Sequence, residues 1–386
     1  MTVESEPEGA ERGARSVALV GCGFVADLYM RSFARHPDVA LIRAWDRDPA
    51  RLEAFCRHWG VAPARSLEEL LGAAPTGSVI LNLTNPAAHY AVSRACLEAG
   101  HHVYSEKPLA VTMEEARALH ALAGERGRLL ASAPCSVLGE AAQTLGRALR
   151  DGVAGTPRLV YAELDDGFIP QAPWRGWRSE SGAPWPGGDE FATGCTLEHA
   201  GYYLTWLMAF FGPVRRVVAA SAGVIPDKPS DGPAAPDMSV AVLEFDGVIA
   251  RLTCSIVAPH DHRIRVFGDA GVLEVGRAWD NAAPVRVRRR FVVRRRLLEH
   301  PVGRRIRLKG PTHPKVTRKG AAAMNFALGP VEMLDALAEG RPCRLSADFA
   351  LHLTEVTLAI QNAGLATGAQ EMTTGCPPME PMPWAR

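Results

Sequence analysis

A glycine-rich turn constrains the fold of this chain more than any other feature. Gly21, Gly23 and Ala26 directly follow the apolar run 16–20 and open a helical pattern over 24–35. Gly21 permits a tight turn, Gly23 lets a ligand approach the backbone, and Ala26 keeps helix and strand close. Because the N-terminus of a helix offers free N–H groups to a phosphate, this strand–turn–helix predicts a dinucleotide-binding site.

The residues around this turn indicate which dinucleotide binds. We expect the backbone from Gly23 through Phe24 and Val25 to face the pyrophosphate. Asp46 ends the next expected strand, about 20 residues on, where a carboxylate accepts both ribose hydroxyls and repels a 2′-phosphate. This predicts NAD as the cofactor. The adjacent Arg47 could pair with a 2′-phosphate, so NADP stays open.

Short apolar runs alternate with helical patterns throughout the first part of the chain. We expect strands at 16–20, 40–45, 78–83, 102–104 and 129–132, and helices at 24–35, 49–59, 66–71, 89–99 and 112–126. Such alternation predicts parallel strands with right-handed helical crossovers. We therefore assign 16–150 to an α/β Rossmann domain with a doubly wound parallel sheet.

The pattern changes after about Pro157. We expect strands at 158–164, 215–221, 238–245, 248–256, 263–268 and 271–275, and helices at 197–211, 326–337 and 346–361. Several of the strands alternate polar and apolar residues. They predict a second domain of the α+β kind over 151–366, with a large and mostly antiparallel open sheet, followed by a Pro-rich tail at 367–386.

Composition limits where the protein acts and what it binds. The chain carries 43 Lys+Arg against 42 Asp+Glu, which predicts neither a nucleic-acid nor a membrane partner. Residues 1–15 lack an apolar run, so we expect a disordered leader and a cytoplasmic protein. The eight cysteines form no Cys-x-x-Cys pair, and their spacing is neither a zinc pattern nor that of a small disulfide framework. We interpret them as buried thiols, and we expect no metal site.

The segment 286–319 is strongly basic and lies in an expected insertion at about 280–322. A solvated hairpin and a partly disordered insertion both fit its composition. A functional alternative is the attraction of an anionic substrate such as a nucleotide sugar. No recognised nucleic-acid-binding module accompanies the charge.

Three motifs resemble those of the Gfo/Idh/MocA family, named for glucose–fructose oxidoreductase and inositol dehydrogenase. They are 84–89 (TNPAAH), 99–108 (AGHHVYSEKP) and 151–155 (DGVAG), and the resemblance spans 16 to about 364. It implies that Glu106 and Lys107 lie beside the nicotinamide, with Lys107 reaching the reacting oxygen. It also implies that Thr84, Asn85 and His89 line the cofactor. The alternative is that Glu106 and Lys107 merely form a surface ion pair.

The resemblance also implies a catalytic helix on which an Asp is followed, four residues later, by a His. Aligned through Tyr203, this chain carries Glu198 and Tyr202 at those positions. We hypothesise that Tyr202 is the acid/base, with its pKa lowered by Lys107, and that Glu198 orients the substrate. His199 is the rival acid/base, although it lies about 100° round an α-helix from Glu198. The third interpretation is that this helix no longer has a catalytic role.

The segment before this helix is rich in side chains that suit a carbohydrate. Indole rings stack on sugar faces, and Asp and Arg bond hydroxyls, so we expect a carbohydrate or cyclitol substrate here. The candidate substrate residues are Asp165, Trp174, Arg175, Trp177 and Trp185. Alternatively, these Trp residues simply pack the loop.

Together these features predict an oxidoreductase that transfers a hydride to or from a secondary alcohol or ketone of a sugar, nucleotide sugar or cyclitol. Two alternatives stay open. The absence of the family's Asp and His is compatible with a cofactor-binding regulator without turnover, and a glycoside-cleaving enzyme that oxidises its substrate transiently with NAD would use the same residues. We expect a homodimer or homotetramer, because the exposed face of such a sheet commonly forms the interface.

Overall fold

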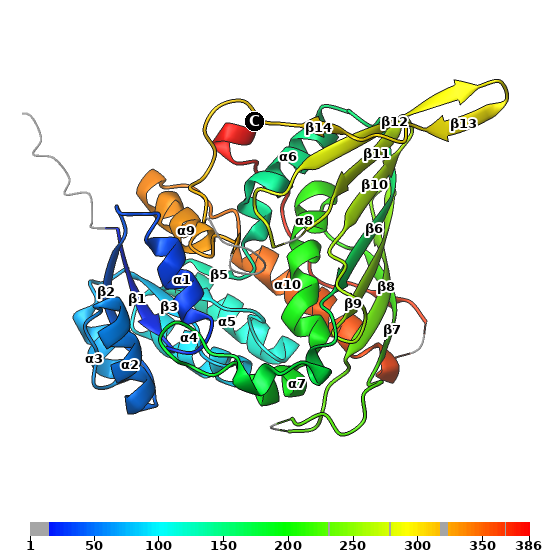
Figure 1. The fold of residues 1–386 in the computed structure, drawn as a ribbon. Helices are drawn as coiled ribbons and strands as arrows, with labels where there is room; N and C mark the ends of the chain where they lie inside the picture. The colour runs from blue at the N-terminus through cyan, green and yellow to red at the C-terminus, as the bar shows by residue number, and fades with distance from the viewer. Residues whose placement is uncertain (1–14, 231, 278, 317–322, 367) are drawn as a thin grey trace, which may run out of the picture.

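The computed structural model describes residues 15–386 apart from 231, 278, 317–322 and 367 (Figure 1). Almost all of the expected leader and the end of the basic insertion therefore lie outside the described residues. The chain forms two sheets with a layer of helices between them (Figure 1). No described helix combines the length and the apolar character that crossing a bilayer requires.

The first sheet is parallel, in the order β2-β1-β3-β4-β5, as predicted. Its strands are β1 (Ser16–Val20), β2 (Ala40–Trp45), β3 (Val79–Asn82), β4 (His102–Ser105) and β5 (Leu130–Ser132). Its helices are α1 (Ala26–Phe33), α2 (Pro49–Trp59), α3 (Leu67–Ala73), α4 (His89–Glu98) and α5 (Met113–Arg126). Local signals set these ends: Asp48, Ser66 and Thr112 cap α2, α3 and α5.

Both faces of β1, β3, β4 and β5 are buried, as is typical of a doubly wound fold, whereas the edge strand β2 is mostly half-buried. Successive residues of β1 point to opposite faces, so Val17 and Leu19 join a core that continues into the second half of the chain. Ala18 and Val20 join a separate core with residues from α4 and α5. The face of the sheet that Val17 and Leu19 line therefore packs against the second half of the chain.

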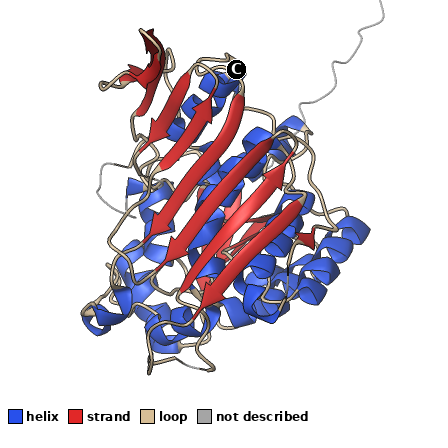
Figure 2. Ribbon diagram, turned by 90° about the vertical axis from the view of Figure 1, so that its right-hand side faces the viewer, coloured by secondary structure: helices blue, strands red, loops and turns tan. Residues whose placement is uncertain are grey.

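The second sheet has the order β13-β12-β11-β10-β6-β9-β8-β7-β15, with β14 beside β12. Among the described strands of this second sheet only the β6–β9 pair is parallel, so the mostly antiparallel prediction is confirmed. Helices cover one face and leave the other open (Figure 2). The strands are β6 (Pro157–Asp165), β7 (Arg216–Ala222), β8 (Met238–Phe245), β9 (Val248–Ser255), β10 (Ile264–Gly268), β11 (Gly271–Val275), β12 (Val285–Val293), β13 (Arg296–Glu299), β14 (Arg304–Ile306) and β15 (Gln370–Glu371).

The basic segment contains a hairpin. Strands β12 and β13 pair through Phe291 and Leu298 and project away from the body of the molecule (Figure 1). Arg294 takes the left-handed conformation in the connecting turn, with a φ of 54°. This part of the basic segment therefore has the structure of a hairpin, which was one of the two structures expected for it.

The remaining helices join the two sheets. They are α6 (Glu140–Arg150), α7 (Gly187–Thr193), α8 (Gly201–Phe211), α9 (Leu328–Glu339) and α10 (Ala347–Gln361). Although α9 and α10 come late in the chain, α9 packs on β3, β4 and β5, and α10 contacts both α5 and β7. A Cβ at Gly329 would lie 2.3 Å from the Tyr104 hydroxyl, so only glycine permits α9 to approach β4 this closely.

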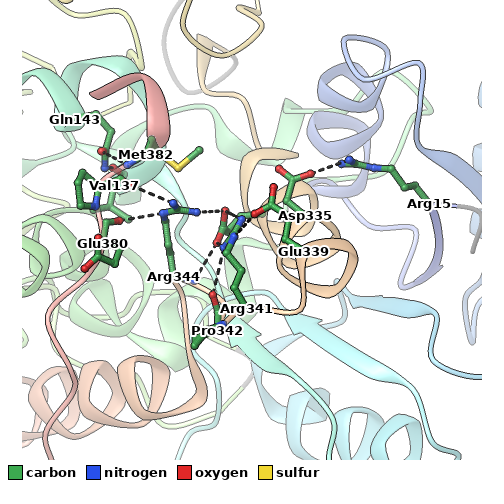
Figure 3. Close-up of polar contacts among 12 residues, drawn as sticks. Arg15, Val137, Gln143, Asp335, Glu339, Arg341, Pro342, Arg344, Glu380 and Met382 are labelled. Atoms are coloured by element: carbon green, nitrogen blue, oxygen red, sulfur yellow. Dashed lines mark hydrogen bonds and ion pairs between the residues drawn. The ribbon is translucent and has the colours of Figure 1, made fainter. Parts of the chain in front are cut away.

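Charged contacts hold the C-terminal segment against this helical layer (Figure 3). The buried Glu332 of α9 pairs with Arg341 and with Arg344, whose Nη1 lies 2.8 Å from the Glu332 carboxylate. Arg344 also donates to the carbonyl oxygens of Glu380 and Pro381. The Pro-rich segment is therefore fastened to α9 through Arg344, whose guanidinium is held by the buried Glu332.

Candidate active site

The glycine-rich turn has the geometry that a dinucleotide needs. Gly21 has a φ of 96°, and a Cβ there would lie 2.6 Å from the carbonyl oxygen of Leu83. A Cβ at Gly23 would meet nothing within 4 Å, so the backbone faces open space at the N-terminus of α1. Ala26 is fully buried against the sheet. These residues fit a pyrophosphate held on backbone N–H groups.

Asp46 lies at the end of β2 beside this turn. Its Oδ2 accepts a hydrogen bond from the Cys22 backbone N–H at 2.8 Å, and its Oδ1 accepts from Asp48 N at 2.8 Å. Arg51 places its Nε 3.1 Å from Asp46, whereas the side chain of Arg47 is exposed. Arg51 is thus a second cation near the expected ribose position, and it was not among the predicted site residues.

The loop after β3 is braced from within the protein. Thr84 Oγ1 donates to Asn82 Oδ1 at 2.6 Å, and Asn85 is exposed. The buried His89 ring contacts the carbonyl oxygens of Pro108 at 2.6 Å and Thr84 at 2.9 Å. Burial lowers the pKa of His89. His89 therefore ties the loop after β3 to the loop after β4.

Glu106 and Lys107 point in different directions from the end of β4. Glu106 is buried, and it accepts from the Tyr29 hydroxyl at 2.7 Å and from Lys107 N at 3.0 Å. Lys107 Nζ instead donates to Glu198 Oε2 of the second domain, with 18% and 5% of the two side chains exposed. The pair that forms is thus Lys107–Glu198, buried between the domains, and no surface pair joins Glu106 to Lys107.

One cation and two carboxyl groups share this buried position. Burial opposes a charge on Lys107, but Glu198 and then Glu190 raise its pKa well above the usual value. Burial raises the pKa of Glu198 although Lys107 opposes the shift. Burial, and then the neighbouring Glu198, also raises the pKa of Glu190. The arrangement favours an ionised Lys107–Glu198 pair beside a protonated Glu190.

The prediction of one regular helix over 197–211 is wrong in its first turn. Residues Thr196–Ala200 form a π-helical turn, η5, and α8 begins at Gly201. Gln361 of α10 provides a physical reason, because its amide accepts from Leu197 N at 3.3 Å and donates to Thr193 O at 2.6 Å. A π turn is wider than an α turn, so residues four apart remain on one side, and such turns are frequent at functional sites.

Tyr202 and His199 occupy buried positions with different surroundings. The Tyr202 ring packs edge-on against Trp279 at 5.7 Å. Burial raises the pKa of Tyr202, and Lys107 lowers it by less, so the predicted net lowering is wrong for the protein alone. His199 places Nε2 3.8 Å from Asp166 Oδ2, and burial lowers its pKa to about 4. At neutral pH the phenol carries a proton and the imidazole is neutral.

Neighbouring acidic residues at the end of β6 face opposite ways. Asp165 accepts from Ser255 Oγ at 2.7 Å, and burial raises its pKa. Asp166 instead faces His199. Because adjacent strand residues alternate between faces, the inward direction of Leu164 assigns Asp166 to the inner side. This alternation could have been read from the sequence, where it favours Asp166 over the predicted Asp165.

The indoles pack against one another. Trp174 contacts Trp185 at 5.8 Å and Phe191 at 5.5 Å, and Trp177 contacts Trp185 at 5.2 Å. The exposed Arg175 lies 4.5 Å over the Trp174 ring. Trp174 is buried, and it therefore fits the alternative interpretation in which the indole packs the loop. Trp185 also lines a small cavity, together with Ile169, Glu190, Phe191, Cys195, Glu198, His199 and Ile256.

The loop that carries these indoles reaches across to the first domain. Ser181 donates to Asp27 Oδ2 through its backbone N–H at 3.2 Å and its hydroxyl at 2.8 Å. Arg31 and Glu180 form an ion pair at 2.6 Å. Since Asp27 and Arg31 belong to α1, the loop lies beside the helix that follows the glycine-rich turn.

Three further polar side chains gather at the edge of this site. Asp166 Oδ1 lies 3.5 Å from His262 Nε2 and 4.0 Å from His260 Nε2. The signal in the sequence was His260-Asp261-His262, because residues two apart in extended backbone point the same way. Cysteine spacing does not report a His-x-His site of this kind, so the prediction of no metal site did not take these residues into account.

The model of an oxidoreductase family with an NAD-binding Rossmann fold matches residues 15–133, and the model of the Gfo/Idh/MocA C-terminal domain matches residues 142–274. The chain belongs to the Gfo/Idh/MocA family. It is therefore an oxidoreductase with a nicotinamide-binding Rossmann domain, as predicted.

Individual relatives cover most of this Gfo/Idh/MocA chain. An uncharacterized oxidoreductase of Synechocystis is 26% identical over 80% of this chain and 83% of its own. A dTDP-3,4-didehydro-2,6-dideoxy-alpha-D-glucose 3-reductase of Streptomyces antibioticus is 28% identical over 66% and 74%. The WlbA dehydrogenase of Bordetella pertussis, solved with NADH and UDP-GlcNAcA, has a TM-score of 0.70 at 20% identity, over 93% and 98% of the chains. That likeness concerns the fold.

Proposed function

We propose that this enzyme transfers a hydride between a nicotinamide cofactor and a secondary alcohol or ketone of a sugar, nucleotide sugar or cyclitol, with Tyr202 and Lys107 managing the proton. The contact of Lys107 with Glu198 carries the proposal. It brings a cation at the carboxyl end of β4 against the turn that leads into Tyr202. Ligands of open α/β sheets bind at this edge. When bound, the nicotinamide supplies or accepts the hydride.

The protonation states favour ketone reduction. Tyr202 keeps its proton at neutral pH because burial raises its pKa. A protonated phenol within reach of the substrate donates that proton as an alkoxide forms. Lys107 stays charged and stabilises the developing negative oxygen. Glu198 holds Lys107 in place. We propose this role for Glu198 instead of the orientation of the substrate that the sequence led us to expect.

NAD is the cofactor that we propose. The Asp46 carboxylate lies where the ribose of a dinucleotide would bind and would repel a 2′-phosphate. Arg51 beside Asp46, together with Arg47, provides cations that NADP would need. A comparison of the affinities for NAD and for NADP therefore tests whether Asp46 or the two arginines determine the choice of cofactor. We expect Asp46→Ala to weaken NAD binding more than NADP binding.

Support for a carbohydrate substrate comes from the relatives and from the surface. The Streptomyces relative is named as a reductase of a dTDP-linked sugar, and the Bordetella structure holds a UDP-linked sugar. Trp185 borders the cavity beside Glu198. We also propose a homo-oligomer, since Val218, Val242 and Ile249 on the open sheet are 46%, 44% and 39% exposed.

Tyr202→Phe tests the acid/base assignment, with Tyr161→Phe on the open face of the sheet as the matched control. Both variants are titrated with NAD and NADP and then assayed by NADH absorbance against keto-sugars, sugars, cyclitols and nucleotide sugars. We expect Tyr202→Phe to lower kcat by about 10²–10⁴-fold with cofactor affinity retained. Unchanged turnover would refute the role of Tyr202. A chain that binds neither cofactor would refute the dinucleotide site.

A further inference from the structure

Asp166, His260 and His262 form a compact cluster of metal-ligating groups that the proposed hydride transfer does not use. Asp166 follows β6, and the two histidines precede β10. One ligand atom from each lies within 4.8 Å of the other two. The side chains of Asp166 and His262 are 10% and 1% exposed, whereas that of His260 is 54% exposed. The cluster is thus buried at its base and reachable through His260.

The distances in this cluster suit a shared ion better than direct hydrogen bonds. Asp166 Oδ1 lies 3.5 Å and 4.0 Å from the two Nε2 atoms. Ligands about 2.0–2.1 Å from a tetrahedral zinc ion lie about 3.4 Å from one another. His262 Nε2 is buried and has no hydrogen-bond partner among the described residues. Buried polar atoms are seldom left without a partner, so this nitrogen points to an absent ligand.

We propose that Asp166, His260 and His262 bind one divalent transition-metal ion of the zinc class. Imidazole nitrogen and carboxylate oxygen are ligands that zinc accepts. Three protein ligands leave at least one coordination position for an oxygen atom from outside the protein. The His-x-His spacing and the turn after β6 supply the ligands from two segments that the sheet brings together.

The surroundings place this ion next to the catalytic helix. The Trp279 ring lies 4.5 Å from the His262 ring and 5.7 Å from the Tyr202 ring. His199 approaches the second oxygen of Asp166 at 3.8 Å. An ion here would lie one aromatic ring away from Tyr202. Coordination of a substrate hydroxyl by its open position is a further step, which rests on the proposed function.

Zinc binding by the full chain tests the site without substrate or cofactor. Protein stripped with a chelator is equilibrated with Zn²⁺ under reducing conditions, and bound zinc is measured by mass spectrometry. We expect about one ion per chain, and at least about a 100-fold weaker affinity in Asp166→Asn and in His260→Gln. His260→Gln alters a half-exposed side chain, so the fold is retained. NAD binding by each variant checks this independently.

His120→Gln is the matched control, because His120 also pairs with a carboxylate, Asp348, at 2.7 Å but far from the cluster. Cys376→Ser controls for the thiol that is least buried. Both controls should bind zinc as the wild type does. Failure of the wild type to bind zinc would overturn the site, as would affinities within threefold of wild type in both Asp166→Asn and His260→Gln. Neither result touches the hydride-transfer proposal, which is tested by turnover.

Discussion

Replacing the two carboxyl groups around Lys107 tests the electrostatics of the buried cleft. Lys107 contacts Glu198, and Glu190 also raises the Lys107 pKa. In Glu198→Gln, Glu190 can ionise in its place, because Glu198 contributes to the raised pKa of Glu190. We therefore expect each single variant to lose about 1 kcal/mol or less in unfolding free energy. The double variant leaves a buried cation without either carboxylate and should lose about 3–5 kcal/mol.

The measurement is urea unfolding at pH 7, followed by tryptophan fluorescence, for the wild type, Glu190→Gln, Glu198→Gln and the double variant. Changes are compared through midpoints where the denaturant slopes agree. The double variant should lose at least about 1 kcal/mol more than the sum of the single variants. Effects that add within about 0.5 kcal/mol would show that the two carboxyl groups act independently, and the shared-cation reasoning would be wrong.

Gly21→Ala should lower the unfolding free energy by about 1–3 kcal/mol, because the left-handed backbone disfavours a side chain. Gly23→Ala should leave stability within about 0.5 kcal/mol but weaken NAD binding at least about tenfold, as measured by titration; equal effects of the two would contradict the assigned roles. Stability should fall as pH rises from the ordinary glutamate pKa through the raised pKa of Glu190, by up to about 1.4 kcal/mol per pH unit. A pH series of thermal unfolding should show a flatter profile for Glu190→Gln. Ser181→Ala removes the hydroxyl donor to Asp27 and keeps the backbone donor, so proteolysis of the loop should be about fivefold faster, and unchanged cleavage would show that this hydroxyl is not limiting.

Much of the fold could be predicted from the sequence because its signals are local. Residues that cap or break helices lie next to the positions they act on, so the helices and strands that were predicted have bounds within a few residues of those observed. No bounds were predicted for the helices α6 and α7 or for the strands β12 to β15. The close packing of α9 on β4 depends on Gly329 and Tyr104, which are far apart in the sequence. No periodicity reports a contact of that kind. The approach of α9 and α10 to the first sheet therefore had to come from the structure.

The candidate site was predicted less completely, for a related reason. Lys107 and Glu198 were both named, but their direct contact depends on how the two domains meet. Asp165 was predicted instead of Asp166 at the end of β6, where a shift of one residue moves a side chain to the opposite face of the sheet. The π turn at Thr196–Ala200 depends on bonds from Gln361, which lies on another helix. Side-chain direction at a site is a tertiary property.

Glu198 and Tyr202 occupy the positions at which the family resemblance implies an Asp and a His, and the properties of both residues suit the same direction of reaction. Glu198 reaches Lys107 and keeps it charged. A histidine at position 202 would titrate near neutral pH and could take or give a proton. Tyr202, with a raised pKa, only gives one in the neutral range. A constant cation and a permanently protonated donor suit ketone reduction, whose rate should vary little across neutral pH. Alcohol oxidation requires loss of the phenol proton first, so its rate should rise as the solution becomes more alkaline.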